Sequence, residues 1–199
     1  AGIASSASSM GAIALCLCSI EEKLFEAFNN KAAFFKKSSY IARIGSGSAC
    51  RSLFPVASVW GEFSEIKDSS DLFGIPYVNM MHPVFQSYHD DILIVSKEEK
   101  SVSSTAGHWL MDGNLYAQNR YHQARNRMHN LLPVLKAGDL EAFNTIVEDE
   151  ALTLHALMMT SNPSYLLIRP GTLSIIEKIR VFRQETKLPV CFTLDAGPN

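Results

Sequence analysis

The segment Gly45-Ser-Gly-Ser-Ala-Cys-Arg-Ser52 has the composition of a loop that binds an anion. Its two glycines allow the backbone to approach a ligand closely, and its three serines supply hydroxyl donors. Arg51 adds a permanently charged guanidinium, which pairs well with a carboxylate or a phosphate. A Gly/Ser cluster can equally be an ordinary loop, so this segment by itself leaves both interpretations open.

Two further segments, near the ends of the chain, have related chemistry. Residues 1–9 run Ala-Gly-Ile-Ala-Ser-Ser-Ala-Ser-Ser and lead into an apolar helix. Their serines can simply cap that helix, or they can hold a phosphate together with its free N–H groups. Residues 193–199, Thr-Leu-Asp-Ala-Gly-Pro-Asn, place Asp195 in a turn after a predicted strand. A carboxylate in such a turn often bonds only its own backbone.

The composition is that of an ordinary globular protein, with 47% hydrophobic and 19% charged residues in a chain of 199. The net charge of −2 gives no general attraction to nucleic acid or to an anionic membrane, so we expect neither as a partner. The longest apolar run, residues 10–20, is about half as long as a membrane-spanning helix and indicates a buried helix. The four cysteines and six histidines lack the spacing of a metal site, and the cysteines indicate reduced thiols in the cytoplasm.

Hydrophobic periodicity predicts alternating helices and strands. Helices are expected near residues 10–20, 21–30, 31–44, 115–136 and 140–159, and after Gly171. Strands are expected at residues 57–63, 91–96 and 190–194, and a long loop over residues 67–89 with one extended piece at 77–80. Residues 91–96, Asp-Ile-Leu-Ile-Val-Ser, have the clearest strand signal, the continuous apolar run of a covered sheet. The predicted fold class is α+β, in two domains at residues 1–89 and 90–199.

Four motifs, in the same order along the chain, resemble those of one enzyme family. Ala1-Gly-Ile-Ala-Ser-Ser-Ala-Ser8 resembles the phosphate loop of the superfamily of galactokinase, homoserine kinase, mevalonate kinase and phosphomevalonate kinase. Within that superfamily, three segments resemble the mevalonate diphosphate decarboxylases: Ala42-Arg-Ile-Gly-Ser-Gly-Ser-Ala-Cys-Arg-Ser-Leu-Phe54, Val102-Ser-Ser-Thr-Ala-Gly107 and Thr193-Leu-Asp-Ala-Gly-Pro-Asn199. The resemblance covers the whole chain, whereas the chain covers only the middle of that family's length.

The resemblance implies a two-domain small-molecule-kinase fold. Its N-terminal part would be like domain 2 of ribosomal protein S5, its C-terminal part would be ferredoxin-like, and both would be incomplete at the chain ends. The implied activity is the ATP-dependent decarboxylation of mevalonate 5-diphosphate to isopentenyl diphosphate, through phosphorylation at C3. A sibling mevalonate 3-kinase, a decarboxylase of the monophosphate and a non-catalytic relative remain open as alternatives. Relatives of this kind are often homodimers, so a homodimer is expected.

The resemblance also implies roles for individual residues. Asp195 would act at the C3 hydroxyl of the substrate, as base or orienting group, and Arg51 would grip the substrate carboxylate; both would be catalytic. The further substrate-binding donors would be Ser46, Ser48, Ser104 and Thr105. The residues facing ATP and its Mg²⁺ would be Ser5, Ser6, Gly2 and Ala4.

Overall fold

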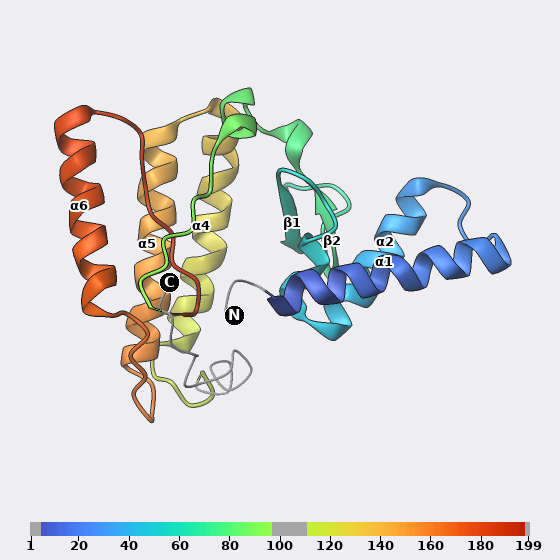
Figure 1. The fold of residues 1–199 in the computed structure, drawn as a ribbon, viewed down its shortest axis with the longest axis horizontal. Helices are drawn as coiled ribbons and strands as arrows, with labels where there is room; N and C mark the ends of the chain where they lie inside the picture. Colours follow the sequence, from blue (N-terminus) through green and yellow to red (C-terminus); the bar gives the residue numbers. More distant parts are fainter. Residues whose placement is uncertain (1–4, 97–110, 198–199) are drawn as a thin grey trace. The chain divides into compact units, whose positions relative to one another are not determined.

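The computed structural model describes residues 5–96 and 111–197, and the chain divides into two compact units (Figure 1). The first unit is Ala1–Met81 and the second is His82–Asn199. Each unit is described by itself below. The domain boundary expected between residues 89 and 90 stays a prediction. No helix in the described residues is long and apolar enough to cross a lipid bilayer.

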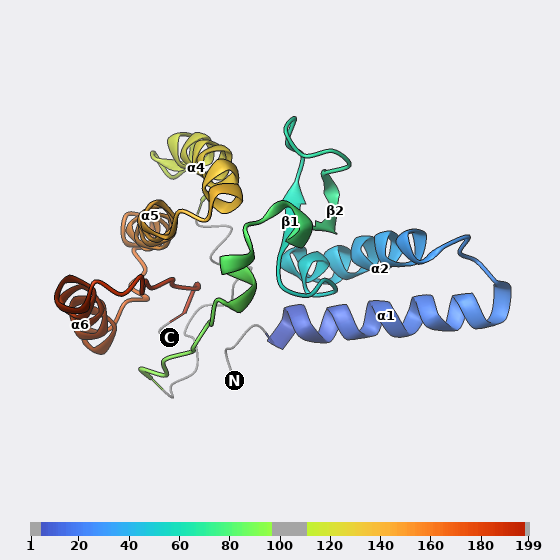
Figure 2. The ribbon, with the colours of Figure 1, turned by 90° about the horizontal axis from the view of Figure 1, so that it is seen from above.

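Two helices, side by side in Figures 1 and 2, form the frame of the first unit. They are α1 (Ser5–Phe25) and α2 (Lys31–Gly45), and the short 3₁₀ helix η1 (Gly47–Arg51) follows α2. Their shared core is built largely of small residues: Ala7, Ala14, Ala42, Ala49 and Leu53. Because these side chains are short, the helices and η1 can approach closely, and the apolar residues around them close the core.

The helix predicted over residues 21–30 is wrong. Residues 21–25 continue α1 instead, and Glu26 then adopts a left-handed φ of 50°, which ends the helix. Asn30 begins the next helix, because its side chain accepts the N–H of Ala33 at 2.8 Å. The capping asparagine therefore makes residues 26–30 a connection between two helices, whereas α2 itself confirms the helix predicted at 31–44.

The sheet of the first unit pairs β1 (Ser58–Gly61) with β2 (Ser70–Pro76) in antiparallel orientation. Val59 faces Ile75 and Trp60 faces Gly74, and the register shifts between Trp60 and Gly61. β1 lies within the strand predicted at residues 57–63. The α+β fold class is confirmed.

The loop predicted over residues 67–89 is wrong, because it contains β2. The extended piece is at Ser70–Pro76, and the short 3₁₀ helix η2 (Val78–Met80) occupies the place where it was expected. Gly74 and Pro76, which indicate a loop in the sequence, are part of this strand. A Cβ on Gly74 would lie 3.0 Å from the carbonyl oxygen of Cys50, so the strand requires glycine at this close approach. Pro76 ends the strand.

One buried hydroxyl joins three elements of the first unit. Ser39, on α2, is completely buried. Its Oγ donates to the carbonyl of Cys50 in η1 at 2.8 Å and accepts the N–H of Gly74 in β2 at 2.8 Å. The hydroxyl therefore satisfies two backbone groups that have no water to bond, and it holds η1 between the helix and the strand.

We predict that Ser39→Ala lowers the free energy of unfolding of the full-length protein by about 1–3 kcal/mol, because it leaves a buried N–H and a buried carbonyl unpaired. Urea denaturation followed by circular dichroism measures this change. Ser19→Ala, at an exposed position of α1, is the control. Equal stability of the two variants would show that the hydroxyl does not support this junction.

In the described residues, the second unit contains the helices α4 (Ala117–Ala137), α5 (Leu140–Met159) and α6 (Pro170–Thr186). They lie in a row with α5 in the middle, as Figures 1 and 2 show. The 3₁₀ helix η3 (Pro83–Ser87) precedes them. Gly138, with a φ of 77°, ends α4, and Asp139 caps α5 by accepting the N–H of Ala142 at 3.0 Å. All three predicted helices are confirmed.

The strands predicted at residues 91–96 and 190–194 are wrong, since neither segment is in a sheet of the described residues. Ile92, Leu93 and Ile94, expected to be covered, are 54%, 52% and 62% exposed. An apolar run becomes a covered strand only where neighbouring strands supply hydrogen-bond partners on its edges. Within the described residues, these two segments have no such neighbours.

Candidate functional site

The loop that carries Arg51 is held by its backbone and exposes its side chain. Ser39 fixes the carbonyl of Cys50, as described above, and the carbonyl of Arg51 accepts the N–H of Phe54 at 3.3 Å and the hydroxyl of Ser58 at 3.2 Å. Arg51 is exposed at the end of η1. Anchored main-chain atoms and a solvent-facing guanidinium are the arrangement that an anion-binding arginine requires.

Ser48 lies on the same short helix as Arg51, and Ser46 directly precedes that helix. Ser46 starts η1 through its main-chain carbonyl, which accepts the N–H of Ala49 at 2.8 Å, while its hydroxyl makes no capping bond. Ser48 is exposed. Between them, a Cβ on Gly47 would lie 3.3 Å from the Trp60 ring, so the loop packs closely on β1. The two hydroxyl donors and the guanidinium predicted to bind substrate thus belong to one anchored turn.

The start of α1 belongs to the same unit and packs on the same turn. Ala7 of α1 and Ala49 of η1 share one core cluster, and the Cβ of Ser52 lies 3.5 Å from the position of a Cβ on Gly11. Ser5 and Ser6 are exposed in the first turn of α1, which has no acidic side chain. The structure therefore brings the serines predicted to face ATP close in the fold to the predicted substrate turn. Gly2 and Ala4 lie outside the described residues.

Asp195 lies in the second unit, in the turn that its sequence predicted. The carboxylate is exposed, and its Oδ1 accepts the N–H of Ala196 at 2.7 Å. The main-chain carbonyl of Asp195 accepts the N–H of Gly197, also at 2.7 Å. These local bonds set the orientation of the carboxylate by the shape of the turn. Ser104 and Thr105, predicted to bind substrate from this part of the chain, lie outside the described residues.

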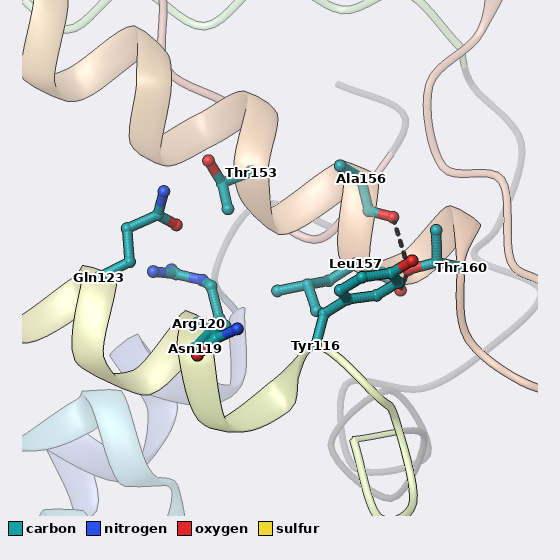
Figure 3. A pocket seen from close by; sticks show the side chains of 8 residues that line it. All are labelled: Tyr116, Asn119, Arg120, Gln123, Thr153, Ala156, Leu157 and Thr160. Carbon is teal, nitrogen blue, oxygen red and sulfur yellow. Dashed lines mark hydrogen bonds between the residues drawn. The ribbon is translucent and has the colours of Figure 1, made fainter.

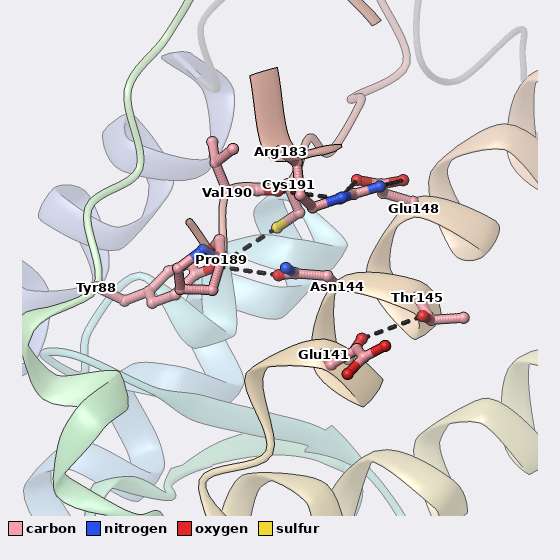
Figure 4. A network of polar contacts seen from close by, with 9 residues as sticks. All are labelled: Tyr88, Glu141, Asn144, Thr145, Glu148, Arg183, Pro189, Val190 and Cys191. Carbon is pink, nitrogen blue, oxygen red and sulfur yellow. Dashed lines mark hydrogen bonds and ion pairs between the residues drawn. The ribbon is translucent and has the colours of Figure 1, made fainter. Parts of the chain in front are cut away.

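An ion pair between a half-buried arginine and a buried glutamate anchors the segment that leads to Asp195 (Figure 4). Arg183 of α6 contacts both carboxylate oxygens of Glu148 of α5, at 2.5 and 3.2 Å, and donates to the carbonyl of Val190 at 3.0 Å. The hydrogen bond to Glu148 raises the pKa of the Arg183 guanidinium. Glu148 is only 7% exposed, so its charge depends on this partner. The pair therefore fixes α6 and residue 190 to the same turn of α5.

A second set of contacts holds the same segment. The hydroxyl of Tyr88 lies 3.1 Å from Oδ1 of Asn144, 3.2 Å from the carbonyl of Pro189 and 3.6 Å from Sγ of Cys191 (Figure 4). Burial raises the pKa of the Tyr88 phenol and also that of the Cys191 thiol. Both groups therefore stay protonated near neutral pH, and their role here is to bond and pack. All four cysteines of the chain are free thiols.

We predict that Glu148→Gln lowers the free energy of unfolding of the full-length protein by about 2 kcal/mol, because the half-buried Arg183 loses the charge of its partner. Thermal and urea denaturation measure the loss. The matched control is Glu177→Gln on the exposed face of α6, which should stay within about 0.5 kcal/mol of the unsubstituted protein. A Glu148 variant as stable as this control would contradict the anchoring role of the ion pair.

His155 is a functional candidate that sequence reasoning missed. It lies on α5, is only 2% exposed, and neither of its ring nitrogens has a hydrogen-bond partner among the described residues. Burial lowers the pKa of its imidazole below the ordinary 6.5, and the nearby main chain and carboxylate of Asp195 oppose this only in part. The ring is therefore neutral near pH 7. The available signal was its spacing from Asn144 and Glu148, which places all three on one side of the helix.

The depressed pKa of His155 predicts how stability depends on pH. In the unfolded chain His155 binds a proton near its ordinary pKa, whereas in the folded chain its imidazole stays neutral to lower pH. The free energy of unfolding should therefore decrease as the pH falls below about 6.5. His155→Leu should weaken this decrease, because it removes the group. Urea midpoints of both proteins at about pH 7.5 and about pH 5.5 test this linkage. The linkage would be contradicted if the urea midpoint changed between the two pH values by the same amount in both proteins.

An open groove of about 360 Å³ lies between α4 and α5 (Figure 3). The residues that line it are Tyr116, Asn119, Arg120, Gln123, Thr153, Ala156, Leu157 and Thr160. Its charged member, Arg120, is already paired with Glu150, which also binds Arg127 at 2.9 Å. One carboxylate is thus shared by two guanidinium groups, so Arg120 has a partner within the protein.

Solved structures of one enzyme class are similar to nearly the whole chain. A mevalonate diphosphate decarboxylase from Legionella pneumophila is 26% identical, with a TM-score of 0.76 over 99% of this chain and 57% of that one. The enzyme from Enterococcus faecalis is 27% identical, with a TM-score of 0.73 over 100% of this chain and 56% of that one. The fold of this chain is therefore that of the decarboxylases of this class.

Family comparison is more specific. The model described as the mevalonate 5-diphosphate decarboxylase C-terminal domain matches residues 91–199, and that of the diphosphomevalonate decarboxylase-like N-terminal domain matches residues 1–71. Because these matches include more than half of the residues, the chain belongs to the diphosphomevalonate decarboxylase family. This confirms the resemblance inferred from the four motifs.

Curated relatives agree with this assignment. The diphosphomevalonate decarboxylase of Ganoderma lucidum is 32% identical over 206 residues, which cover 100% of this chain and 49% of the relative. That of Danio rerio is 31% identical over 174 residues, covering 81% of this chain and 40% of the relative. The chain spans about half the length of the curated relatives it matches.

Proposed function

We propose that the full-length protein decarboxylates mevalonate 5-diphosphate to isopentenyl diphosphate at the expense of ATP, in the mevalonate pathway of isoprenoid biosynthesis. The observation that carries the proposal is the match of both halves of the chain to this one family. Among the similar structures, one is described as a complex with MVAPP, AMPPCP and magnesium. The exposed Asp195 carboxylate and the exposed Arg51 guanidinium are chemically suited to this substrate.

The proposed reaction needs two kinds of help from the protein. Transfer of the γ-phosphoryl group of ATP to the C3 hydroxyl makes that oxygen a good leaving group. Departure of phosphate leaves positive character at C3, and the C–C electron pair released with carbon dioxide forms the double bond. The balanced products are ADP, phosphate, carbon dioxide and isopentenyl diphosphate. A carboxylate near C3 and donors around the anionic groups meet these needs by electrostatics and positioning.

Asp195 suits the first task. Its Oδ1 is oriented by the N–H of Ala196, and the exposed carboxylate can accept the proton of the C3 hydroxyl or align that hydroxyl for attack. Its negative charge then favours the developing positive charge at C3. The bond from Ala196 orients the carboxylate and leaves it exposed to act on substrate.

Arg51, Ser46 and Ser48 suit the second task. Arg51 would hold the substrate carboxylate through its planar fork, and the two serine hydroxyls would donate to the carboxylate or the diphosphate. Ser104 and Thr105 would add donors of the same kind. The anchored backbone of η1 limits the reorganisation that binding requires, which is how such donors become effective.

The first turn of α1 fits the phosphates of ATP. Its exposed Ser5 and Ser6, together with the free N–H groups of a helix start, form a donor set for a polyanion, and no acidic side chain repels it. Gly2 and Ala4 would complete the loop. The described residues hold no group of three His, Cys, Asp or Glu side chains able to bind a metal. In this proposal Mg²⁺ is held mainly through the nucleotide phosphates, whose charge it neutralises.

Localisation and assembly are part of the same proposal. Four free thiols suit the reducing cytoplasm, where we place the protein. A homodimer, and the absence of nucleic-acid and membrane partners, stay predictions.

We predict that Asp195→Asn in the full-length protein lowers kcat by about 10²- to 10⁴-fold while the KM for mevalonate 5-diphosphate changes little. The amide keeps the shape of the carboxylate but loses its charge and its ability to accept a proton. Release of carbon dioxide and formation of ADP, followed in parallel, measure the effect. Asp112→Asn, at an exposed position of the second unit, is the control and should leave turnover unchanged.

The same assay separates the alternatives. ADP formation without carbon dioxide would indicate a 3-kinase, and turnover with the monophosphate alone would indicate the sibling decarboxylase. Binding without any turnover by the unsubstituted protein would indicate a non-catalytic relative. Each of these results contradicts the proposed function, and near-normal turnover of Asp195→Asn contradicts the role of that residue.

A further inference from the structure

The described residues contain one buried ionisable side chain that the proposed chemistry does not use and whose polar atoms are unsatisfied. His155 is 2% exposed and both its ring nitrogens lack hydrogen-bond partners among the described residues. A buried polar group without partners costs stability, and an apolar side chain of similar size would avoid this cost. A polar ring at this position therefore requires a reason other than packing.

The path of the chain beside α5 shows what lies next to this ring. The segment that follows α6 is fixed to α5 at Pro189, through Tyr88 and Asn144, and at Val190, through Arg183 and Glu148. Figures 1 and 2 show that this segment then runs alongside α5. These contacts place Pro189 beside Asn144, so distances along the segment and along α5 can be measured from the same level.

Simple geometry then brings Asp195 to the level of His155. Along α5, eleven residues from Asn144 to His155 rise about 16 Å. An extended chain covers about 20 Å in the six residues from Pro189 to Asp195. The two lengths differ by about one residue of extended chain, so Asp195 and His155 lie at about the same level. Phe192 is buried between these points, with the guanidinium of Arg180 5.7 Å from its ring, so the segment is packed against the helices here.

The electrostatic environment of the ring identifies the same neighbour. Burial keeps the imidazole neutral near pH 7, and the groups that oppose this by favouring its protonated form are the main chain and the carboxylate of Asp195. No hydrogen bond between the ring and Asp195 satisfies both distance and angle. The ring is thus close to the Asp195 turn, and its N–H can be donated to an acceptor of that turn. Among the described residues, Oδ1 of Asp195 bonds the adjacent amide of Ala196.

We propose that His155 is a positioning residue for Asp195, and that its buried imidazole supports, from the protein side, the turn that presents the carboxylate. The expected effect on turnover rests on the proposed function, whereas the expected effect on the order of the Asp195 turn does not. A neutral ring can support the main chain of the turn without neutralising the carboxylate, whereas a buried cation at the same place would pair with it. The arrangement therefore keeps the carboxylate charged and in place.

The experiment compares His155→Leu and His155→Phe, which remove the N–H, with His155→Gln, which retains a donor, in the full-length protein. We expect the two apolar variants to lower kcat about 10- to 100-fold, as a displaced catalytic group does, with KM changed less than about threefold. The glutamine variant should recover most of the loss. Hydrogen exchange measured by mass spectrometry should show faster exchange of the amides of Ala196 and Gly197 in the apolar variants alone.

The control is His122→Leu, at an exposed position of α4, which should change neither turnover nor exchange. Normal kcat and normal exchange in the apolar variants would overturn the proposal. So would a failure of both apolar variants to fold while the glutamine variant is folded and active, because residue 155 would then serve folding instead of positioning. If the unsubstituted protein released no carbon dioxide, the proposed function would fail, and the exchange measurement alone would decide the role of His155.

Discussion

The first unit depends on one constraint, which is the satisfaction of buried backbone groups by the hydroxyl of Ser39. This side chain joins the carbonyl of Cys50 to the N–H of Gly74, and glycine at 74 is what lets the strand approach so closely. Arg51 follows Cys50 directly, so the same bonds that close the core also anchor the loop that exposes the guanidinium. Stability and the geometry of the candidate anion site therefore have a common origin.

The second unit solves a similar problem with charge. The segment that leads to Asp195 is not in a sheet of the described residues, and its position comes from side chains of α5 instead. Asn144, Glu148 and His155 lie along that helix, and the first two hold residues 189 and 190 through Tyr88 and Arg183. A polar row on a helix face thus replaces the hydrogen-bond ladder that a neighbouring strand would supply.

Apart from residues 21–30, the predicted helices agree with the structure to within a few residues, whereas of the predicted strands only that at residues 57–63 contains a strand in the described residues. Gly138 and Pro170 marked helix ends because their effect is local, whereas residues 21–30 were misassigned because the cap at Asn30 was not recognised. Residues 91–96 have a strong strand pattern but no strand partner in the described part of the chain. Residues 70–76 form a strand although they contain Gly74 and Pro76. Glycine at position 74 leaves room for the carbonyl of Cys50, so here it favours the packing of the strand. Strand formation depends on distant residues, which local periodicity does not contain.

The sequence by itself determined the family, the helices and the turn at Asp195, because these follow from short motifs and local backbone preferences. Residue type also indicated Arg51, Ser46 and Ser48 as anion-binding candidates, and these roles stay predictions. Only the tertiary structure decided that Ala7 and Ala49 share a core, which brings the start of α1 to the Arg51 turn, and that His155 is buried without partners near Asp195. Burial and unpaired polar atoms are properties of packed neighbours, so they arise only when distant segments meet.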